Sequence, residues 1–138
     1  MKIERFEDIK AWKLARELTH KVYGLTKKKD FAGDYGLKQQ IQNAAGSAMH
    51  NIAEGFDSET TAEFIRFLRY AKRTCTEVQS ELYVALDENY ITNSEFQDVY
   101  EQARQARAAI HGFIKIPKDL SNLETLNCEL RTVNAKRL

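Results

Sequence analysis

The chain has 138 residues, the length of one domain, with 43% hydrophobic residues, 30% charged residues and a formal net charge of +1. This balance excludes an intrinsically disordered chain and provides no global attraction to nucleic acid or to an anionic membrane. Because the N-terminus lacks a leader-like pattern and no apolar run approaches about 18 residues, we expect a cytoplasmic protein without a membrane partner.

The first half of the chain predicts two helices. One proline and six glycines leave few points where a helix must break. Apolar spacing predicts a first helix from about Asp8, a suitable N-cap, to about Thr26. A second helix is predicted from about Tyr35 to Glu54, with a buried face of mostly small residues against which a neighbouring helix can pack closely. Gly55 is expected just beyond its end, where positive φ costs glycine little.

Two capping boxes mark the starts of the next two helices. Thr60 and Glu63 have the spacing at which a hydroxyl and a carboxylate satisfy each other's backbone donors, and a long apolar stripe follows them. Thr92 and Glu95 repeat this pattern before the fourth helix, which Pro117 should close. Both boxes predict well-defined helix starts.

The predicted elements combine into an all-α fold. Four long amphipathic helices joined by short loops favour an antiparallel up-down-up-down four-helix bundle over residues 1–117. A further capping box at Ser121 and Glu124 predicts a short helix in the C-terminal tail, residues 118–138. That helix is marginal on its own and would need to dock on the bundle to be stable.

No residue pattern points to catalysis. A di-iron site in a helical bundle needs a Glu-x-x-His pair on each of two helices, whereas Glu17 and His20 form the only such pair and face away from the apolar stripe. Cys75 falls within the apolar stripe of the third helix, and Cys75 and Cys128 lack the paired spacing of a zinc site. We therefore expect no metal, no cofactor, no small-molecule substrate and no enzymatic activity.

Basic side chains gather on one side of the third helix, away from its apolar stripe. They are Arg66, Arg69, Lys72 and Arg73. One interpretation is a basic strip that binds the phosphates of RNA or another nucleic acid. The alternative is a solvated face whose charge is balanced along the helix by carboxylates. These are Glu63, Glu77 and Glu81.

Other residues are candidates for contacts between copies of the chain. They are Asn51, Glu54, Trp12, Tyr23, Tyr70 and Arg107. The first two are polar positions beside the packing face of the second helix, and the three aromatic residues lie beyond the apolar stripes. These rings could equally pack within their own bundle. Arg107 lies near the edge of the fourth apolar stripe, so we expect it to be buried and paired with a glutamate, or to lie at a subunit contact.

Two blocks of the chain carry a family pattern. The first reads Asn51-Ile52-Ala53-Glu54-Gly55, and the second contains Glu63, Phe64, Arg66, Phe67 and Leu68. Together they resemble the four-helix-bundle proteins encoded in intervening sequences of bacterial 23S ribosomal RNA genes. The resemblance extends from Phe6 to about Pro117 and leaves the C-terminal tail uncovered.

This resemblance implies a homopentamer with a central channel. The related accessory variability determinants of diversity-generating retroelements share that architecture and bind a reverse transcriptase and nucleic acid. The expected partners are therefore other copies of the chain together with RNA, or alternatively a nucleic-acid-handling protein for which the chain is a scaffold. One departure bears on subunit packing, because Arg73-Thr74 replaces a Gly-Ser step that is usual in the family.

Overall fold

The computed structural model describes residues 3–115, and this part of the chain is entirely helical, with no strand. Its elements are η1 (Phe6–Asp8), α1 (Lys10–Thr26), α2 (Lys29–Gly33), α3 (Tyr35–Phe56), α4 (Thr61–Asp87) and α5 (Asn93–Ile114). Within this range, no helix has the length and apolar character needed to cross a membrane. Pro117, Cys128 and the predicted tail helix lie outside the described residues.

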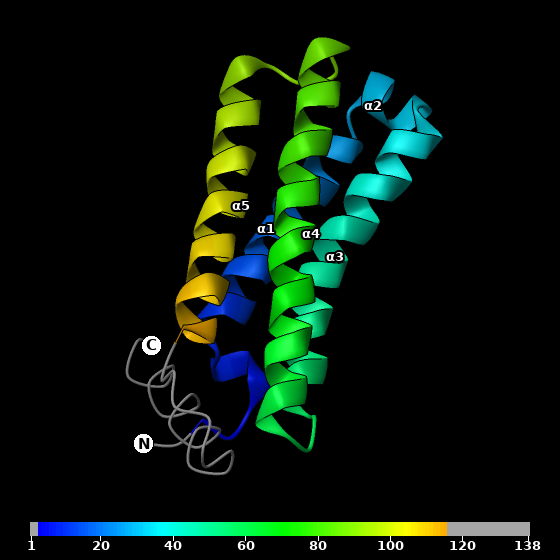
Figure 1. Ribbon diagram of the computed structural model, residues 1–138. Coiled ribbons are helices and arrows are strands. Elements are labelled where there is room, and N and C mark those ends of the chain that lie inside the picture. Colours follow the sequence, from blue (N-terminus) through cyan, green and yellow to red (C-terminus); the bar gives the residue numbers. More distant parts are fainter. Residues whose placement is uncertain (1–2, 116–138) are drawn as a thin grey trace.

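The four long helices lie side by side, and the short α2 sits at one end of the molecule beside the loop between α4 and α5 (Figure 1). Helix α3 contacts both α1 and α4, and α5 also contacts both α1 and α4. The core therefore lies between the four helices. The apolar stripe predicted for α3 is wholly buried. It comprises Leu37, Ile41, Ala44, Ala45, Ala48 and Ile52.

Helix α1 begins differently from the prediction. Asp8 was predicted as its N-cap, but Asp8 belongs to the short turn η1 and the helix begins at Lys10 after Ile9. The Ile9 side chain is fully buried, and Phe6 meets Trp12 edge-on with 5.1 Å between ring centroids. Apolar packing rather than a polar side chain therefore sets the entry to α1.

Polar caps do begin the other long helices. The box at the start of α5 is complete, because Thr92 Oγ1 accepts from the Glu95 N–H and the Glu95 carboxylate accepts from the Thr92 N–H. At α4, Thr60 Oγ1 accepts from the Glu63 N–H at 3.1 Å, while the Glu63 carboxylate lies 3.5 Å from Arg66. The first half of that predicted box is therefore present.

An unpredicted contact joins two chain segments at one end of the molecule. Asp34 Oδ1 caps α3 by accepting from the Leu37 N–H at 3.1 Å, and its Oδ2 accepts from the Tyr90 hydroxyl at 2.9 Å. The Tyr90 ring also stacks on Phe31 of α2, with 5.4 Å between centroids. One carboxylate thus connects the start of α3 to the loop after α4.

Gly55 has a different role from the predicted one. It lies inside α3, and no described glycine has a positive φ, so it is not a C′ residue. A Cβ added at Gly55 would lie 2.7 Å from Phe67 Cβ and 2.9 Å from Phe64 Cδ1. Glycine is required at this position because α3 and α4 approach too closely there for any side chain.

Gly55→Ala should therefore destabilise the protein by about 1–3 kcal/mol, since the added methyl group must displace two phenylalanines of α4. Gly24→Ala is the matched control, because a Cβ at that exposed position of α1 meets nothing within 4 Å. The control should raise stability by about 0.5–1 kcal/mol through helix propensity. Urea unfolding followed by circular dichroism measures both, and equal effects would contradict the packing role of Gly55.

Candidate functional site

The basic side chains predicted to form one strip divide between two sides of α4. Arg66 and Arg73 flank the ring of Tyr70, with guanidinium carbons 6.0 and 5.5 Å from its centroid. The Tyr70 ring is 42% exposed. We call these three residues the Arg–Tyr–Arg row. Lys72 lies toward α5 instead, and Arg69 is near enough to lower the pKa of Lys72.

A second group of cations crosses from α4 to α5. Lys72 Nζ lies 2.9 Å from His111 Nδ1, and Arg107 Nε donates to Thr76 Oγ1 at 3.1 Å. Lys115 follows His111 by one helical turn, so it extends the same side of α5. Sequence reasoning missed His111 and Lys115, although the spacing of four residues from Arg107 to His111 to Lys115 is visible in the chain.

Like charges alter the titration of this group. Burial, followed by the nearby Arg107, Lys115 and Arg69, lowers the pKa of Lys72. The charge of Lys72, followed by burial and by Lys115 and Arg107, lowers the pKa of His111 below its usual 6.5. His111 is therefore mostly neutral at pH 7, and its Nδ1 can accept a hydrogen bond from the Lys72 ammonium group.

The structure places Arg107 on the surface and Trp12 within the packing of its own chain. Arg107 was expected to be buried and paired with a glutamate, or to lie at a subunit contact. In the single chain it is exposed and donates to the hydroxyl of Thr76 rather than to a glutamate, so the subunit contact stays a prediction. Trp12 is 8% exposed and packs against Phe6, with the Arg16 guanidinium 5.8 Å from its ring. The Trp12 ring therefore packs within its own chain.

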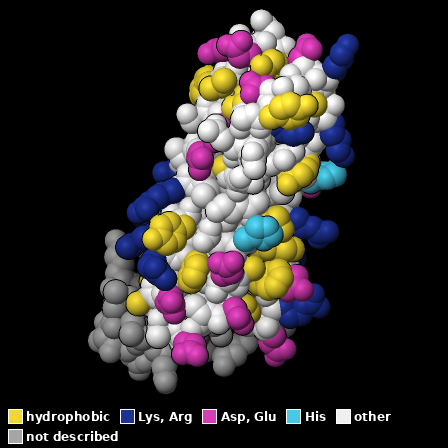
Figure 2. All heavy atoms as spheres, turned by 90° about the vertical axis from the view of Figure 1, so that its right-hand side faces the viewer, with side chains coloured by type: hydrophobic (Ala, Val, Ile, Leu, Met, Phe, Trp, Pro, Cys, Tyr) yellow, Lys and Arg dark blue, Asp and Glu magenta, His cyan; other side chains and the backbone are white. Residues whose placement is uncertain are grey.

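The remaining interface candidates surround one face of α3. Asn51 is half-buried, and its Nδ2 donates to both the carbonyl and the hydroxyl of Ser47 at 2.8 Å. Tyr23 is 45% exposed and Glu54 is exposed. These three line a shallow hollow of about 410 Å³. Figure 2 shows uncharged surface in the middle of this face, basic side chains along its two sides and acidic side chains toward its ends.

Glu81 does not belong to the solvated charges of α4. It was expected to help balance the basic strip, but it is only 9% exposed and its Oε2 has no partner among the described residues. Burial, reinforced by the neighbouring Glu77, raises the pKa of Glu81 to about 8. Near neutral pH this carboxyl is largely protonated, so it offsets little of the positive charge on α4.

The stability of the protein should fall as pH rises from about 4.5 to 8, because Glu81 is ionised in the unfolded chain but stays protonated in the folded one. Glu81→Gln removes this dependence, since a buried amide stays neutral throughout this pH range. We expect the variant to be about 1–3 kcal/mol more stable than the natural protein at pH 8.

Chemical denaturation at a series of pH values measures this effect, with the exposed Glu59→Gln as the control that should follow the natural protein. Parallel stability curves for the natural protein and Glu81→Gln would show that Glu81 ionises normally in the folded state.

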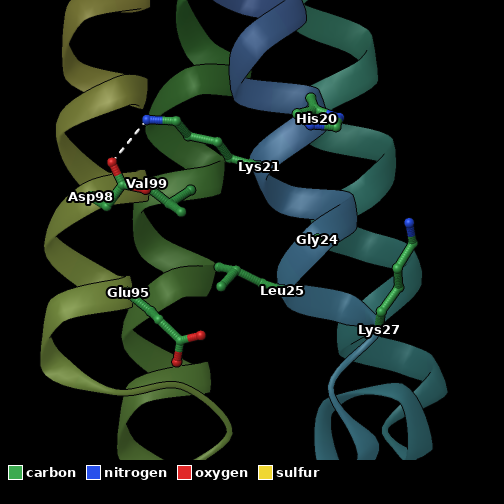
Figure 3. Close-up of a pocket in the computed structure, with 8 residues that line it drawn as sticks. All are labelled: His20, Lys21, Gly24, Leu25, Lys27, Glu95, Asp98 and Val99. Atoms are coloured by element: carbon green, nitrogen blue, oxygen red, sulfur yellow. Dashed lines mark hydrogen bonds and ion pairs between the residues drawn. The ribbon is translucent and has the colours of Figure 1, made fainter.

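A hollow of about 320 Å³ lies between α1 and α5, and charged side chains from both sides line it (Figure 3). Lys21 reaches across from α1 to Asp98 of α5 at 2.8 Å, and Glu95 pairs with Lys28. Lys27 points away from both carboxylates. The Lys21–Asp98 pair joins the two helices across the hollow, while His20 and Lys27 line it from α1 and the segment that follows.

Residues 3–115 contain neither a group of metal ligands nor a reactive thiol. No three His, Cys, Asp or Glu side chains in that range are grouped so that they could hold a metal ion. Glu17 and His20 are both exposed on α1. Cys75 is fully buried, and burial raises the pKa of its thiol to about 12, so the nucleophilic thiolate is not formed at neutral pH.

Comparisons with known proteins identify a family and a fold. The sequence model described as 23S rRNA-intervening sequence protein matches residues 7–112. A crystal structure of a protein of unknown function from the S23 ribosomal protein family of Bacteroides thetaiotaomicron superposes with a TM-score of 0.72 and 20% identity. The match covers 76% of this chain and 98% of that one, and at this identity it shows a shared fold. None of the curated proteins compared with the chain matches it.

Proposed function

Because the chain belongs to the family of 23S rRNA-intervening sequence proteins, we propose that it is a non-enzymatic homo-oligomer that contacts RNA through the basic side chains of α4. In this proposal the protomer is an antiparallel up-down-up-down four-helix bundle. The resemblance of the sequence favours five copies around a central channel. Catalysis plays no part, in keeping with the burial of Cys75, which raises the pKa of its thiol to about 12.

The Arg–Tyr–Arg row is the observation that carries the RNA contact. A half-exposed tyrosine ring flanked by two guanidinium groups offers both a surface for base stacking and charges for phosphates. Planar guanidinium groups beside an aromatic ring are also held in a defined orientation. Arg66, Tyr70 and Arg73 are spaced along one side of α4, so successive nucleotides of a single strand could follow the helix.

The burial of Glu81 favours the phosphate-binding interpretation over the solvated one. The solvated interpretation needs three carboxylates to balance four cations. Glu81 is largely protonated near neutral pH, which leaves Glu63 and Glu77 for that purpose, and Glu63 lies 3.5 Å from Arg66. The positive charge of α4 is therefore less compensated than its composition indicates, and its field can attract an anionic partner.

The α3 face supports the proposal of an assembly. Residues 39–53 contain no Asp, Glu, Lys or Arg, although several of their side chains are exposed. A solvated helix face normally carries charges, whereas the cores of protein interfaces are depleted of them. Tyr23 and Asn51 lie along this neutral surface, which is the geometry expected if another copy of the chain packs there.

Removing the two arginines of the row should weaken RNA binding. Arg66→Gln with Arg73→Gln is expected to lower affinity for single-stranded RNA by about tenfold or more and to reduce the salt dependence of binding. The matched control is Lys10→Gln with Lys13→Gln, which removes the same charge from exposed positions of α1. Fluorescence anisotropy against salt measures both. Equal affinities for the two double variants would exclude the row as an RNA contact.

The molecular mass in solution tests the proposed assembly. Light scattering should give about five times the 15.9 kDa of one chain. Asn43→Glu places a charge on the neutral α3 face and should dissociate the assembly, because an interface buries such a charge at high cost. Gln97→Glu, an exposed change on α5, should leave the mass unaltered. A monomeric natural protein would contradict the proposed assembly whatever the variants do.

A protein-interaction scaffold, such as an accessory protein of a retroelement reverse transcriptase, is the second candidate. The neutral α3 face favours it, because such a surface suits a protein partner as well as another copy of the chain. A pull-down distinguishes the two functions. A protein partner retained after nuclease treatment, together with absent RNA binding, would favour the scaffold.

A further inference from the structure

We propose that the cations shared by α4 and α5 form a binding site for a phosphate group. The site consists of Arg69, Lys72, Arg107, His111 and Lys115, which we call the α4–α5 cation cluster. Its members other than Arg69 meet at the α4–α5 boundary, whereas Arg69 lies one turn from both Arg66 and Arg73 and borders the Arg–Tyr–Arg row. The inference therefore goes beyond the proposed stacking of RNA and stands if that proposal fails.

The two helices bring the cluster together through direct contacts. Lys72 Nζ and His111 Nδ1 lie 2.9 Å apart across the α4–α5 boundary, and Arg107 Nε reaches Thr76 Oγ1 at 3.1 Å across the same boundary. Arg69 precedes Lys72 by about one turn on α4, and Lys115 follows His111 by about one turn on α5. The positive groups thus surround one point of contact between two helices.

The cluster lacks the negative partners found elsewhere on the molecule. Among residues 3–115, none of its Arg and Lys side chains lies within ion-pair distance of a carboxylate. Arg104, on the same helix α5, pairs with Glu101, and Lys21 pairs with Asp98. Every charged neighbour that shifts Lys72 or His111 is a cation. The folded chain therefore holds like charges together without internal compensation.

The dipole of α5 accounts for only part of the cluster. Cations near a helix C-terminus are stabilised by the dipole, and His111 and Lys115 are at that end of α5. Arg107 lies about two turns before the end, and Lys72 belongs to the middle of α4, so the dipole effect does not reach them. Beyond hydration by solvent, an external anion is the remaining source of compensation.

The chemistry of the side chains favours phosphate over a single carboxylate. A phosphate ester carries up to about two negative charges and several acceptor oxygens, which suit a guanidinium fork together with ammonium groups. Lys72 Nζ and Arg107 lie on opposite helices, so a tetrahedral anion between the helices could accept from both. His111 would add a further donor once protonated, because a bound anion favours its charged form.

The test is a proton NMR titration of the histidine side chains in the full chain, with inorganic pyrophosphate as one probe and a short single-stranded RNA as the other. A saturating concentration of a probe that binds the cluster should raise the pKa of His111. The titration curves of His20 and His50 should be the same with and without the probe. Sodium chloride at equal ionic strength controls for screening. Response to pyrophosphate assigns the site to small phosphates, and response to RNA alone assigns it to the nucleic-acid backbone.

Variants at exposed positions decide whether the cluster binds the anion. Arg107→Gln with Lys115→Gln should weaken the binding seen at His111 by about tenfold or more, whereas Arg104→Gln, which removes an arginine already paired with Glu101, should not. Arg66→Gln with Arg73→Gln should also leave the His111 response intact, which separates this site from the Arg–Tyr–Arg row. A His111 that responds to neither probe, or equal binding by all variants, would overturn the inference.

Discussion

The close approach of α3 and α4 is the constraint on which the rest of the molecule depends. At Gly55 no side chain fits between the helices, and small residues along α3 keep the separation short toward its other end. Helix α4 is then held with one side against α3 and another against α5. Because both of those sides are occupied, its outer residues are confined to narrow strips beside each neighbour. The division of the basic residues follows from this geometry.

The positions of the charges on this protein matter more than their sum. A net charge of +1 suggests an electrically unremarkable chain, yet the carboxylates and the cations are used differently in different places. Between α1 and α5 they are paired, and they join two helices. On α4 one carboxyl is buried and protonated, while cations accumulate beside α5. Local fields on such a surface can be strong although the whole molecule is nearly neutral.

Periodicity predicted the buried stripe of α3 and the complete capping box of α5 correctly, because both depend on spacing within one helix. The failures involve a second helix. Gly55 fits a local rule for helix ends, but a contact with α4 determines its role, and Glu81 appears solvated until its neighbours cover it. A helical wheel also places Arg66 and Lys72 by angle alone. Which neighbouring helix each one meets depends on packing that one helix cannot reveal.

The contact between Asp34 and Tyr90 has a mechanical consequence. It connects the start of α3 with the loop after α4, at the end of the molecule where α2 lies, whereas Gly55 is near the other end of α3. Sliding α3 along α4 by one residue would move it about 1.5 Å, enough to break the bond at one end and force a clash at the other. The pair is thus locked against axial slippage. Every copy of the chain would therefore hold the neutral face of α3 and the cations of α4 at the same axial distance from each other.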